Sequence, residues 1–100
     1  MKTREEYIAL IASHAEELQN TFGIISLRLF GSVARNEHHD GSDVDIYVEM
    51  PPKFSLVVRL KSYLEALLGS PVDIIRKHQH LNPFLLKEIE RDGIEVIAER

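Results

Sequence analysis

Leu29-Phe30-Gly31-Ser32-Val33-Ala34-Arg35, followed after a polar loop by Ser42-Asp43-Val44-Asp45-Ile46, is the part of the sequence that decides the fold. Alternating apolar residues up to Phe30 predict a β-strand that ends in a tight turn, and the second stretch predicts another strand. Successive side chains of a strand point to opposite faces, so Asp43 and Asp45 project to the same side, with Cβ atoms about 6 to 7 Å apart. That spacing allows one divalent cation to lie between them.

Carboxylate oxygens without nitrogen or sulfur ligands favour a hard cation such as Mg²⁺, which takes its remaining ligands from water and substrate phosphates. A third carboxylate, Asp73, lies in the apolar run Val72-Asp73-Ile74-Ile75. A charge in such a strand needs a partner if it is buried, and a metal is one such partner. The alternative is an edge strand on which Asp73 faces water. The presence of Asp43 and Asp45 favours the metal interpretation.

Gly31 and Ser32 come at the predicted junction between a strand and a short helical turn around Val33-Ala34-Arg35. A glycine permits close backbone approach, and the following N–H groups and the Ser32 hydroxyl can hold a phosphate. Neither Gly-Ser nor the Asp-x-Asp pattern is diagnostic alone, because both occur by chance in many proteins. The order of the two motifs and the distance between them along the chain are more specific than either motif alone.

The rest of the chain supplies helices and strands around this centre. Thr3 and Glu6 form a capping box for a helix that is predicted to continue to about Asn20. Further predicted helices are 54–68, stopped by Gly69, and one that begins at Asn82-Pro83 and ends near Gly93. The predicted strands are 25–30, 43–50, 72–75 and 94–98. Helices between strands predict a single α/β domain over residues 1–100, with a small mixed sheet of three to four strands and helices packed on it.

Composition excludes several classes of function. The chain has 12 Lys and Arg against 16 Asp and Glu, a formal net charge of −4, which argues against general attraction to nucleic acid. It has no Cys, so disulfides, thiolate nucleophiles and iron–sulfur sites are excluded. No apolar run approaches the roughly 18 residues of a membrane span, and Met1 is not followed by a signal-peptide pattern. We therefore expect a cytoplasmic protein that does not bind membranes.

The two stretches quoted first resemble the signature of the nucleotidyltransferase superfamily related to DNA polymerase beta, G-S-x-A-R-G followed by S-D-x-D-[LIV]. Within it, the chain is similar over its whole length to the minimal nucleotidyltransferases, which are often paired with a HEPN-domain toxin. The resemblance implies the polymerase beta-like fold, nucleotide binding at Gly31 and Ser32, and two Mg²⁺ ions, or Mn²⁺, held by Asp43, Asp45 and Asp73. These three carboxylates are the implied catalytic residues.

The implied reaction transfers AMP from ATP, or a nucleoside monophosphate from another NTP, to a hydroxyl group, with loss of pyrophosphate. In the branch of the family that is paired with toxins, the acceptor is a tyrosine of the HEPN partner, so the chain would act as an antitoxin in a hetero-oligomer. Asp73 is also a candidate for accepting the proton of the acceptor hydroxyl. Ser42 and Arg35 are further candidate nucleotide-binding residues, although Arg35 is equally interpreted as a surface residue paired with Glu37 or Asp40.

Two other functions compete with protein adenylylation. The chain could be a non-catalytic binding module that masks its partner by contact alone, but three carboxylates weigh against that. It could act on a small molecule or an RNA end, yet it is too short to carry a separate acceptor-binding domain and is acidic.

The loop departs from the family pattern at three positions. Asn36 stands where the family usually has Gly. Among the residues other than glycine, Asn tolerates a left-handed backbone best. His38 and His39 are interpreted as solvated loop residues rather than as a zinc site.

Overall fold

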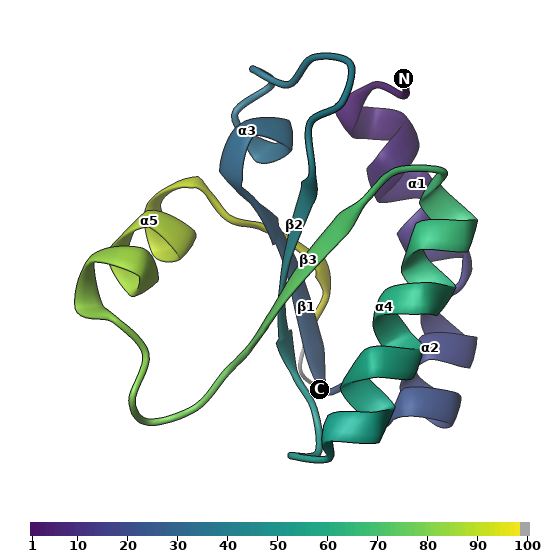
Figure 1. Cartoon of the computed structure of the whole chain (residues 1–100), viewed down its shortest axis with the longest axis vertical. Coiled ribbons are helices and arrows are strands. Elements are labelled where there is room, and N and C mark those ends of the chain that lie inside the picture. Colours follow the sequence, from purple (N-terminus) through teal and green to yellow (C-terminus); the bar gives the residue numbers. More distant parts are fainter. Residues whose placement is uncertain (99–100) are drawn as a thin grey trace.

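The computed structural model describes residues 1–98, which form a four-stranded sheet with helices on both of its sides (Figure 1). In chain order the elements are α1 (Arg4–Ser13), α2 (Ala15–Phe22), β1 (Ser26–Phe30), α3 (Gly31–Ala34), β2 (Val44–Glu49), α4 (Phe54–Leu68), β3 (Val72–Arg76), α5 (Pro83–Asp92) and β4 (Ile94–Ile97). The predicted α/β fold with a small sheet is confirmed.

The sheet has the strand order β3-β2-β1-β4. β1 pairs antiparallel with both β2 and β4, whereas β2 and β3 are parallel because α4 connects them. The sheet is therefore mixed, as the sequence predicts. Its register places Asp45 of β2 between Phe30 of β1 and Asp73 of β3, and β3 forms an edge.

The main core lies between the sheet and the layer of α1, α2 and α4, which cover one side of it in Figure 1. Along β2 the buried residues Val44, Ile46 and Val48 alternate with half-buried ones, as expected for a strand with one covered face. α5 lies on the other side of the sheet, where it packs against β1 and α3. We call this other side the carboxylate face, because Asp45 and Asp73 project from it.

The local signals in the sequence act as predicted. The Thr3 hydroxyl accepts a hydrogen bond from the Glu6 N–H, and the Glu6 carboxylate accepts one from the Thr3 N–H, so both halves of the capping box are present. Asn82 caps α5 through hydrogen bonds from the Phe84 and Leu85 N–H groups.

The opening helix is not continuous to Asn20 as predicted, because it breaks at His14. The His14 backbone has φ −109° and ψ 14°, outside the helical region. The Ser13 hydroxyl and the His14 ring both contact the carbonyl oxygen of Leu10, at 2.8 and 2.9 Å. Side-chain groups thus compete for the acceptor that the His14 N–H would use in a continuous helix, and α2 starts afresh at Ala15.

Three large apolar residues of the predicted strand 25–30 and the predicted helix 54–68 are exposed: Ile25 is 43%, Phe54 85% and Val58 46% exposed. Ile25 comes just before β1, and the other two lie on the outer side of α4. No helix within residues 1–98 is long and apolar enough to cross a membrane.

Candidate active site

Gly31 begins α3 directly after β1 and lies against Asp45 of the neighbouring strand. Its backbone has φ +72°, a conformation that L side chains rarely adopt, and a Cβ built on it would overlap the Asp45 Oδ2 atom. Only glycine therefore permits this turn and this approach. The structure gives a local reason for Gly31, the approach of the Asp45 side chain, and phosphate binding at this turn stays a prediction.

Asp45 and Asp73 lie on the carboxylate face at the same end of β2 and β3, and Asp43 lies just before β2 at that end. Asp45 and Asp73 are direct neighbours in the parallel register, on strands about 4.8 Å apart. Asp43 comes two residues before Asp45 and is exposed, as is Asp73, whereas Asp45 is half-buried. The alternative interpretation, an edge strand on which Asp73 faces water, is observed, and Asp73 also lies next to Asp45 in the register. Metal binding by Asp73 stays a prediction.

The surroundings of Asp45 raise its pKa. Burial, then the charges of Asp73 and Asp43, and then that of Glu88, raise the pKa of Asp45 to about 6. The folded chain thus holds a carboxylate whose negative charge is unfavourable without a cation. Such a group is a candidate for a functional site on physical grounds.

Within residues 1–98, no three His, Asp or Glu side chains are gathered into a group that could already hold a metal ion. The chemistry of the donor set fits Mg²⁺, because all three groups are carboxylates, and Asp45 and Asp73 are neighbours in the register. Binding of Mg²⁺ by Asp43, Asp45 and Asp73 stays a prediction.

The predicted polar loop leaves α3 through a left-handed turn. Asn36 has φ +59° and is the non-glycine residue with positive φ in the described part of the chain. The expectation that Asn36 keeps the turn that the family makes with Gly is thereby confirmed. The Glu37 N–H donates to the Ser32 carbonyl at 2.8 Å, which folds the start of the loop back onto α3.

Ser42 closes the other end of this loop. Its hydroxyl accepts a hydrogen bond from the His39 N–H at 3.0 Å, and its own N–H donates to the His39 carbonyl at the same distance. Ser42 is therefore a loop-closing residue directly before Asp43. Nucleotide binding by Ser42 and by Ser32 stays a prediction.

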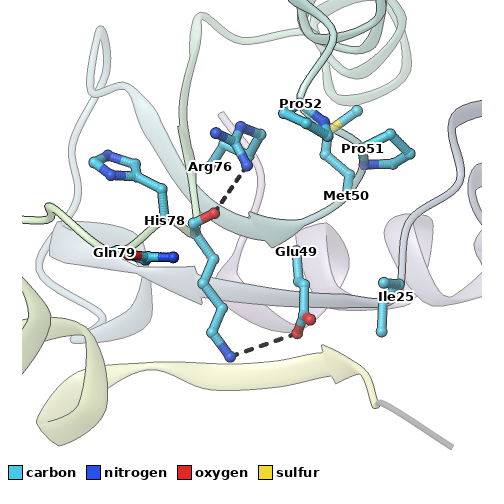
Figure 2. A pocket seen from close by; sticks show the side chains of 9 residues that line it. Ile25, Glu49, Met50, Pro51, Pro52, Arg76, His78 and Gln79 are labelled. Atoms are coloured by element: carbon cyan, nitrogen blue, oxygen red, sulfur yellow. Dashed lines mark hydrogen bonds and ion pairs between the residues drawn. The ribbon is translucent and has the colours of Figure 1, made fainter.

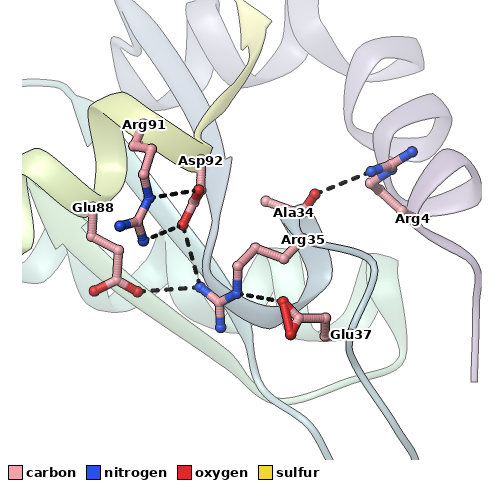
Figure 3. A network of polar contacts seen from close by, with 7 residues as sticks. All are labelled: Arg4, Ala34, Arg35, Glu37, Glu88, Arg91 and Asp92. Carbon is pink, nitrogen blue, oxygen red and sulfur yellow. Dashed lines mark hydrogen bonds and ion pairs between the residues drawn. The ribbon is translucent and has the colours of Figure 1, made fainter.

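Arg35 pairs with three carboxylates (Figure 3). Its guanidinium lies 3.0 Å from Glu37, 3.3 Å from Glu88 and 3.6 Å from Asp92. The predicted pair with Glu37 is present, whereas Asp40 is not a partner of Arg35, because it lies near the Met1 amino group at 3.7 Å. Glu88 and Asp92 come from α5, so Arg35 ties that helix to α3.

His38 is not a solvated loop residue as predicted. Its Nε2 lies 2.9 Å from the Lys2 carbonyl oxygen, and its ring packs edge-on against Tyr7. The Nδ1 atom is buried without a hydrogen-bond partner within the described residues. His39 is exposed as expected, and Tyr7 is buried in the core as its place in the helical stripe predicts.

Sequence reasoning missed Glu88 and Asp92. Both lie more than 50 positions from Arg35, and no local pattern marks them as its partners. Only the packing of α5 against α3 brings Glu88 close enough for its charge to act on Asp45.

Comparison with known proteins agrees with this geometry. Residues 13–100 match the family described as "Polymerase beta, Nucleotidyltransferase". The chain belongs to this family and is a nucleotidyltransferase. The resemblance inferred from the sequence is confirmed.

Two relatives of this nucleotidyltransferase cover nearly its whole length. One, from Methanocaldococcus jannaschii, is named "Putative protein adenylyltransferase MJ1379" and is 41% identical over 100 residues, which cover 96% of this chain and 100% of the relative. The other, from Thermococcus cleftensis, is named "Protein adenylyltransferase MntA" and is 37% identical over 98 residues, covering 96% of this chain and 98% of the relative.

Solved structures share the fold. A structure described as a "putative minimal nucleotidyltransferase" superposes with a TM-score of 0.76 at 33% identity, covering 93% of this nucleotidyltransferase and 95% of that chain. A second one, described as a tri-AMPylated Shewanella oneidensis HEPN toxin in complex with MNT antitoxin, has a TM-score of 0.65 at 19% identity, with 91% and 72% covered. At that identity the second likeness supports the fold alone.

Proposed function

We propose that this nucleotidyltransferase is a Mg²⁺-dependent protein adenylyltransferase that moves AMP from ATP to a tyrosine hydroxyl of a HEPN-type toxin and thereby neutralises it. The observation that carries the proposal is the contact between Gly31 and Asp45, with Asp73 beside Asp45 in register. This arrangement presents carboxylate oxygens and a tight glycine turn on one face, which is what binding of a metal–triphosphate complex requires.

The proposed reaction needs no reactant other than ATP and the acceptor hydroxyl. The acceptor oxygen forms a bond to the α-phosphorus of ATP, the bond from that phosphorus to the bridging oxygen of the β-phosphate breaks, and pyrophosphate leaves. The hydroxyl proton passes to a base, for which the exposed Asp73 carboxylate is our candidate. Bound Mg²⁺ would supply the positive charge that favours deprotonation of the hydroxyl and departure of pyrophosphate.

The residues of this chain bind and orient the nucleotide. The first N–H groups of α3 have no partner within that short helix, so the backbone at Gly31 and Ser32 offers donors to phosphate oxygens. Arg35 fixes α3 against α5 through Glu88 and Asp92 and so holds this backbone in place. Ser42 closes the loop directly before Asp43, and Asp45 follows in β2.

The names of the relatives support a protein acceptor. Both relatives reported above are named protein adenylyltransferases, and they are of the same length class as this chain. Structures that share the fold include complexes of an MNT antitoxin with a HEPN toxin and a toxin–antitoxin complex with AMP-PNP. A HEPN-type partner and ATP are therefore the reactants that we propose.

The test is intact-mass spectrometry of the HEPN-type protein after incubation with this chain, ATP and Mg²⁺. We expect its mass to rise by one or more AMP units, at a tyrosine, and its neutralisation to persist after this chain is removed. The matched variant carries Asp43→Asn and Asp45→Asn, and we expect no added mass with it.

The competing function is masking by contact alone. It requires an unchanged mass of the partner, equal protection by the double variant, and recovery of toxicity when the complex is dissociated. That set of results would overturn the proposal.

A further inference from the structure

The loop between α3 and β2 joins the two parts of the candidate active site. It leaves α3 shortly after the Gly31 turn and ends at Asp43, directly before β2. We call residues 36–42 the site loop. Its internal hydrogen bonds fold its start onto α3 and close its end. Those bonds run within α3 and the loop, so they fix the shape of the loop rather than its place on the fold.

His38 is the side chain that attaches the site loop to the helix layer. Its Nε2 atom lies 2.9 Å from the Lys2 carbonyl oxygen, and its ring packs edge-on against Tyr7, with the ring centroids 6.0 Å apart. Tyr7 is 2% exposed and belongs to the main core. Both neighbours of His38 in the sequence are exposed. The loop is therefore held to the start of α1 through this one imidazole.

The acceptor determines which nitrogen of His38 carries the hydrogen. A carbonyl oxygen only accepts hydrogen bonds, so Nε2 carries the hydrogen and donates it to the Lys2 carbonyl. The Nδ1 atom is buried and has no hydrogen-bond partner within residues 1–98. A buried polar atom without a partner lowers stability, so an apolar ring would pack better at this place. The imidazole instead supplies a directional hydrogen bond, which packing alone does not require.

The start of α1 also contacts the other two segments that carry the candidate site. Arg4 donates to the last carbonyl of α3 at 3.1 Å. The Lys2 ammonium donates to the Leu68 carbonyl at 3.0 Å, and the Tyr7 hydroxyl lies 2.8 Å from that of Ser70, both shortly before β3. In Figure 1 the start of α1 lies at the same end of the molecule as α3 and the site loop. This part of the chain therefore supports the glycine turn, the site loop and the approach to β3 together.

From these contacts we infer that His38 is a positioning residue for nucleotidyl transfer. Its bond to the Lys2 carbonyl and its contact with Tyr7 hold the site loop so that Asp43, at the end of the loop, stays near Asp45. The inference rests on the proposed function, because it takes these two carboxylates to bind Mg²⁺ together. Without the bond, Asp43 is in place in a smaller fraction of molecules, and the apparent affinity for Mg²⁺ with a nucleotide falls by that fraction.

Two other contacts of the site loop do not replace the bond of His38. The Met1 amino group lies 3.7 Å from Asp40, but this carboxylate is 93% exposed, and exposed ion pairs contribute little. The Nδ1 atom of His39 lies 2.9 Å from the Asp40 carbonyl oxygen, a contact that stays within the loop. His39 is therefore the matched control, the same residue type in the same loop with a local contact.

A second control lies at the opposite end of the sheet from Gly31. A hollow of about 550 Å³ is found there, and His78 is one of the residues that line it (Figure 2). The Nδ1 atom of His78 accepts a hydrogen bond from the His80 N–H at 3.0 Å. Substitution of His78 therefore removes an imidazole and its hydrogen bond at a place remote from the site loop.

The test uses two substitutions that separate the ring of His38 from its donor. His38→Phe keeps a ring against Tyr7 and removes both the buried Nδ1 atom and the donor to the Lys2 carbonyl. His38→Gln removes the ring but places an amide N–H close to the position of Nε2. If His38 serves packing alone, the Phe variant should match the wild type and the Gln variant should be worse. If the bond positions the loop, the order is reversed.

Hydrogen exchange and calorimetry measure the loop and its consequence for binding. In His38→Phe, without metal or nucleotide, we expect hydrogen–deuterium exchange at residues 36–43 to be about two- to tenfold faster, as loss of one hydrogen bond implies. The Kd for Mg²⁺ with α,β-methylene-ATP, which cannot transfer AMP, should rise about two- to tenfold. His38→Gln should stay closer to the wild type in both measurements, and melting curves show whether each variant is folded.

Nitrogen-15 NMR of the wild type tests the hydrogen bond without any variant. We expect the neutral His38 ring to carry its hydrogen on Nε2, with a slowly exchanging proton, and none on Nδ1. A hydrogen on Nδ1 of the neutral ring would remove the donor and overturn the inference, also where a variant does not fold.

The variants can overturn the inference in two further ways. Wild-type exchange and Kd in His38→Phe, or larger effects in His38→Gln than in His38→Phe, would assign the residue to packing alone. Equal effects of His39→Phe or His78→Phe would show that the bond to the Lys2 carbonyl is not the cause. A wild type that binds Mg²⁺ with the analogue but transfers no AMP from ATP to the HEPN-type protein counts against the proposed function and leaves the positioning role standing.

Discussion

The backbone of Gly31 lies so close to the Asp45 carboxylate that a Cβ at position 31 would overlap the Asp45 Oδ2 atom. The first prediction follows from this contact. Gly31→Ala should displace the Asp45 side chain in addition to straining the backbone at φ +72°. We expect loss of AMP transfer and a less stable fold, by about 1 to 3 kcal/mol. Activity assays and chemical denaturation measure the two effects.

Gly41 provides the matched control for Gly31→Ala. It has φ +88°, but a Cβ at this position would meet no atom within 4 Å. Gly41→Ala should therefore cost about 1 to 2 kcal/mol through backbone strain, while AMP transfer persists. Equal loss of activity in both variants would show that strain in the loop, and not the contact with Asp45, explains the effect.

The second prediction concerns the charge of Asp45. Burial and the neighbouring carboxylates raise its pKa from 3.8 to about 6, so the folded chain binds this proton more tightly than the unfolded chain does. The negative charge of Asp45 therefore lowers the free energy of unfolding. This loss is complete above pH 6 and shrinks as the pH falls from 6 toward 3.8. Asp45→Asn should raise the melting temperature at pH 7 to 8, and this gain should disappear near pH 4.

Asp43→Asn is the comparison variant for Asp45→Asn. It removes one negative charge from an exposed position of the same cluster. We expect a smaller gain in melting temperature, because water screens this charge better. A gain from Asp45→Asn that does not change between pH 8 and pH 4 would contradict the second prediction.

The sequence was sufficient where local chemistry determines the conformation. The alternation that buries Val44, Ile46 and Val48 and turns Asp45 to the other face requires only the period of a strand. The end of α4 at Gly69 requires only the left-handed conformation of that glycine, with φ +66°. Asn36 follows the same logic, since its positive φ is a property of that residue type at a turn.

The sequence was insufficient where the result depends on contacts between distant residues. The break at His14 depends on two side chains that compete for one carbonyl oxygen of Leu10. The pairing of Asp45 with Asp73 depends on how far α4 carries the chain before β3 begins, which no periodicity measures. The partners of Arg35 on α5 depend on where that helix packs.

The third prediction concerns shared binding of metal and nucleotide. Within residues 1–98 no ready-made three-ligand metal group exists, so Mg²⁺ alone should bind weakly, whereas phosphate oxygens of ATP would complete its ligand shell. We expect Mg²⁺ with ATP to raise the melting temperature by more than the sum of the separate shifts. A ligand at about 100 times its Kd contributes about 2.7 kcal/mol. Additive shifts in a thermal melt would argue against a shared site.

The last prediction separates the two interpretations of Arg35. The positive charge of Arg35 lowers the pKa of Asp45, whereas the negative charge of Glu88 raises it. The Arg35 and Glu88 side chains pair with each other at 3.3 Å. Arg35→Met should therefore raise the pKa of Asp45 further. We expect binding of Mg²⁺ with ATP, measured by calorimetry, to begin at a higher pH than in the wild type. Glu88→Gln should shift the profile to lower pH, and the double variant should lie between them. Arg91→Met is the control, because Arg91 pairs with Asp92 and its charge is not among those that shift the pKa of Asp45, so the profile should stay in place. If Arg35→Met instead weakens ATP binding equally at every pH, Arg35 contacts the phosphates directly.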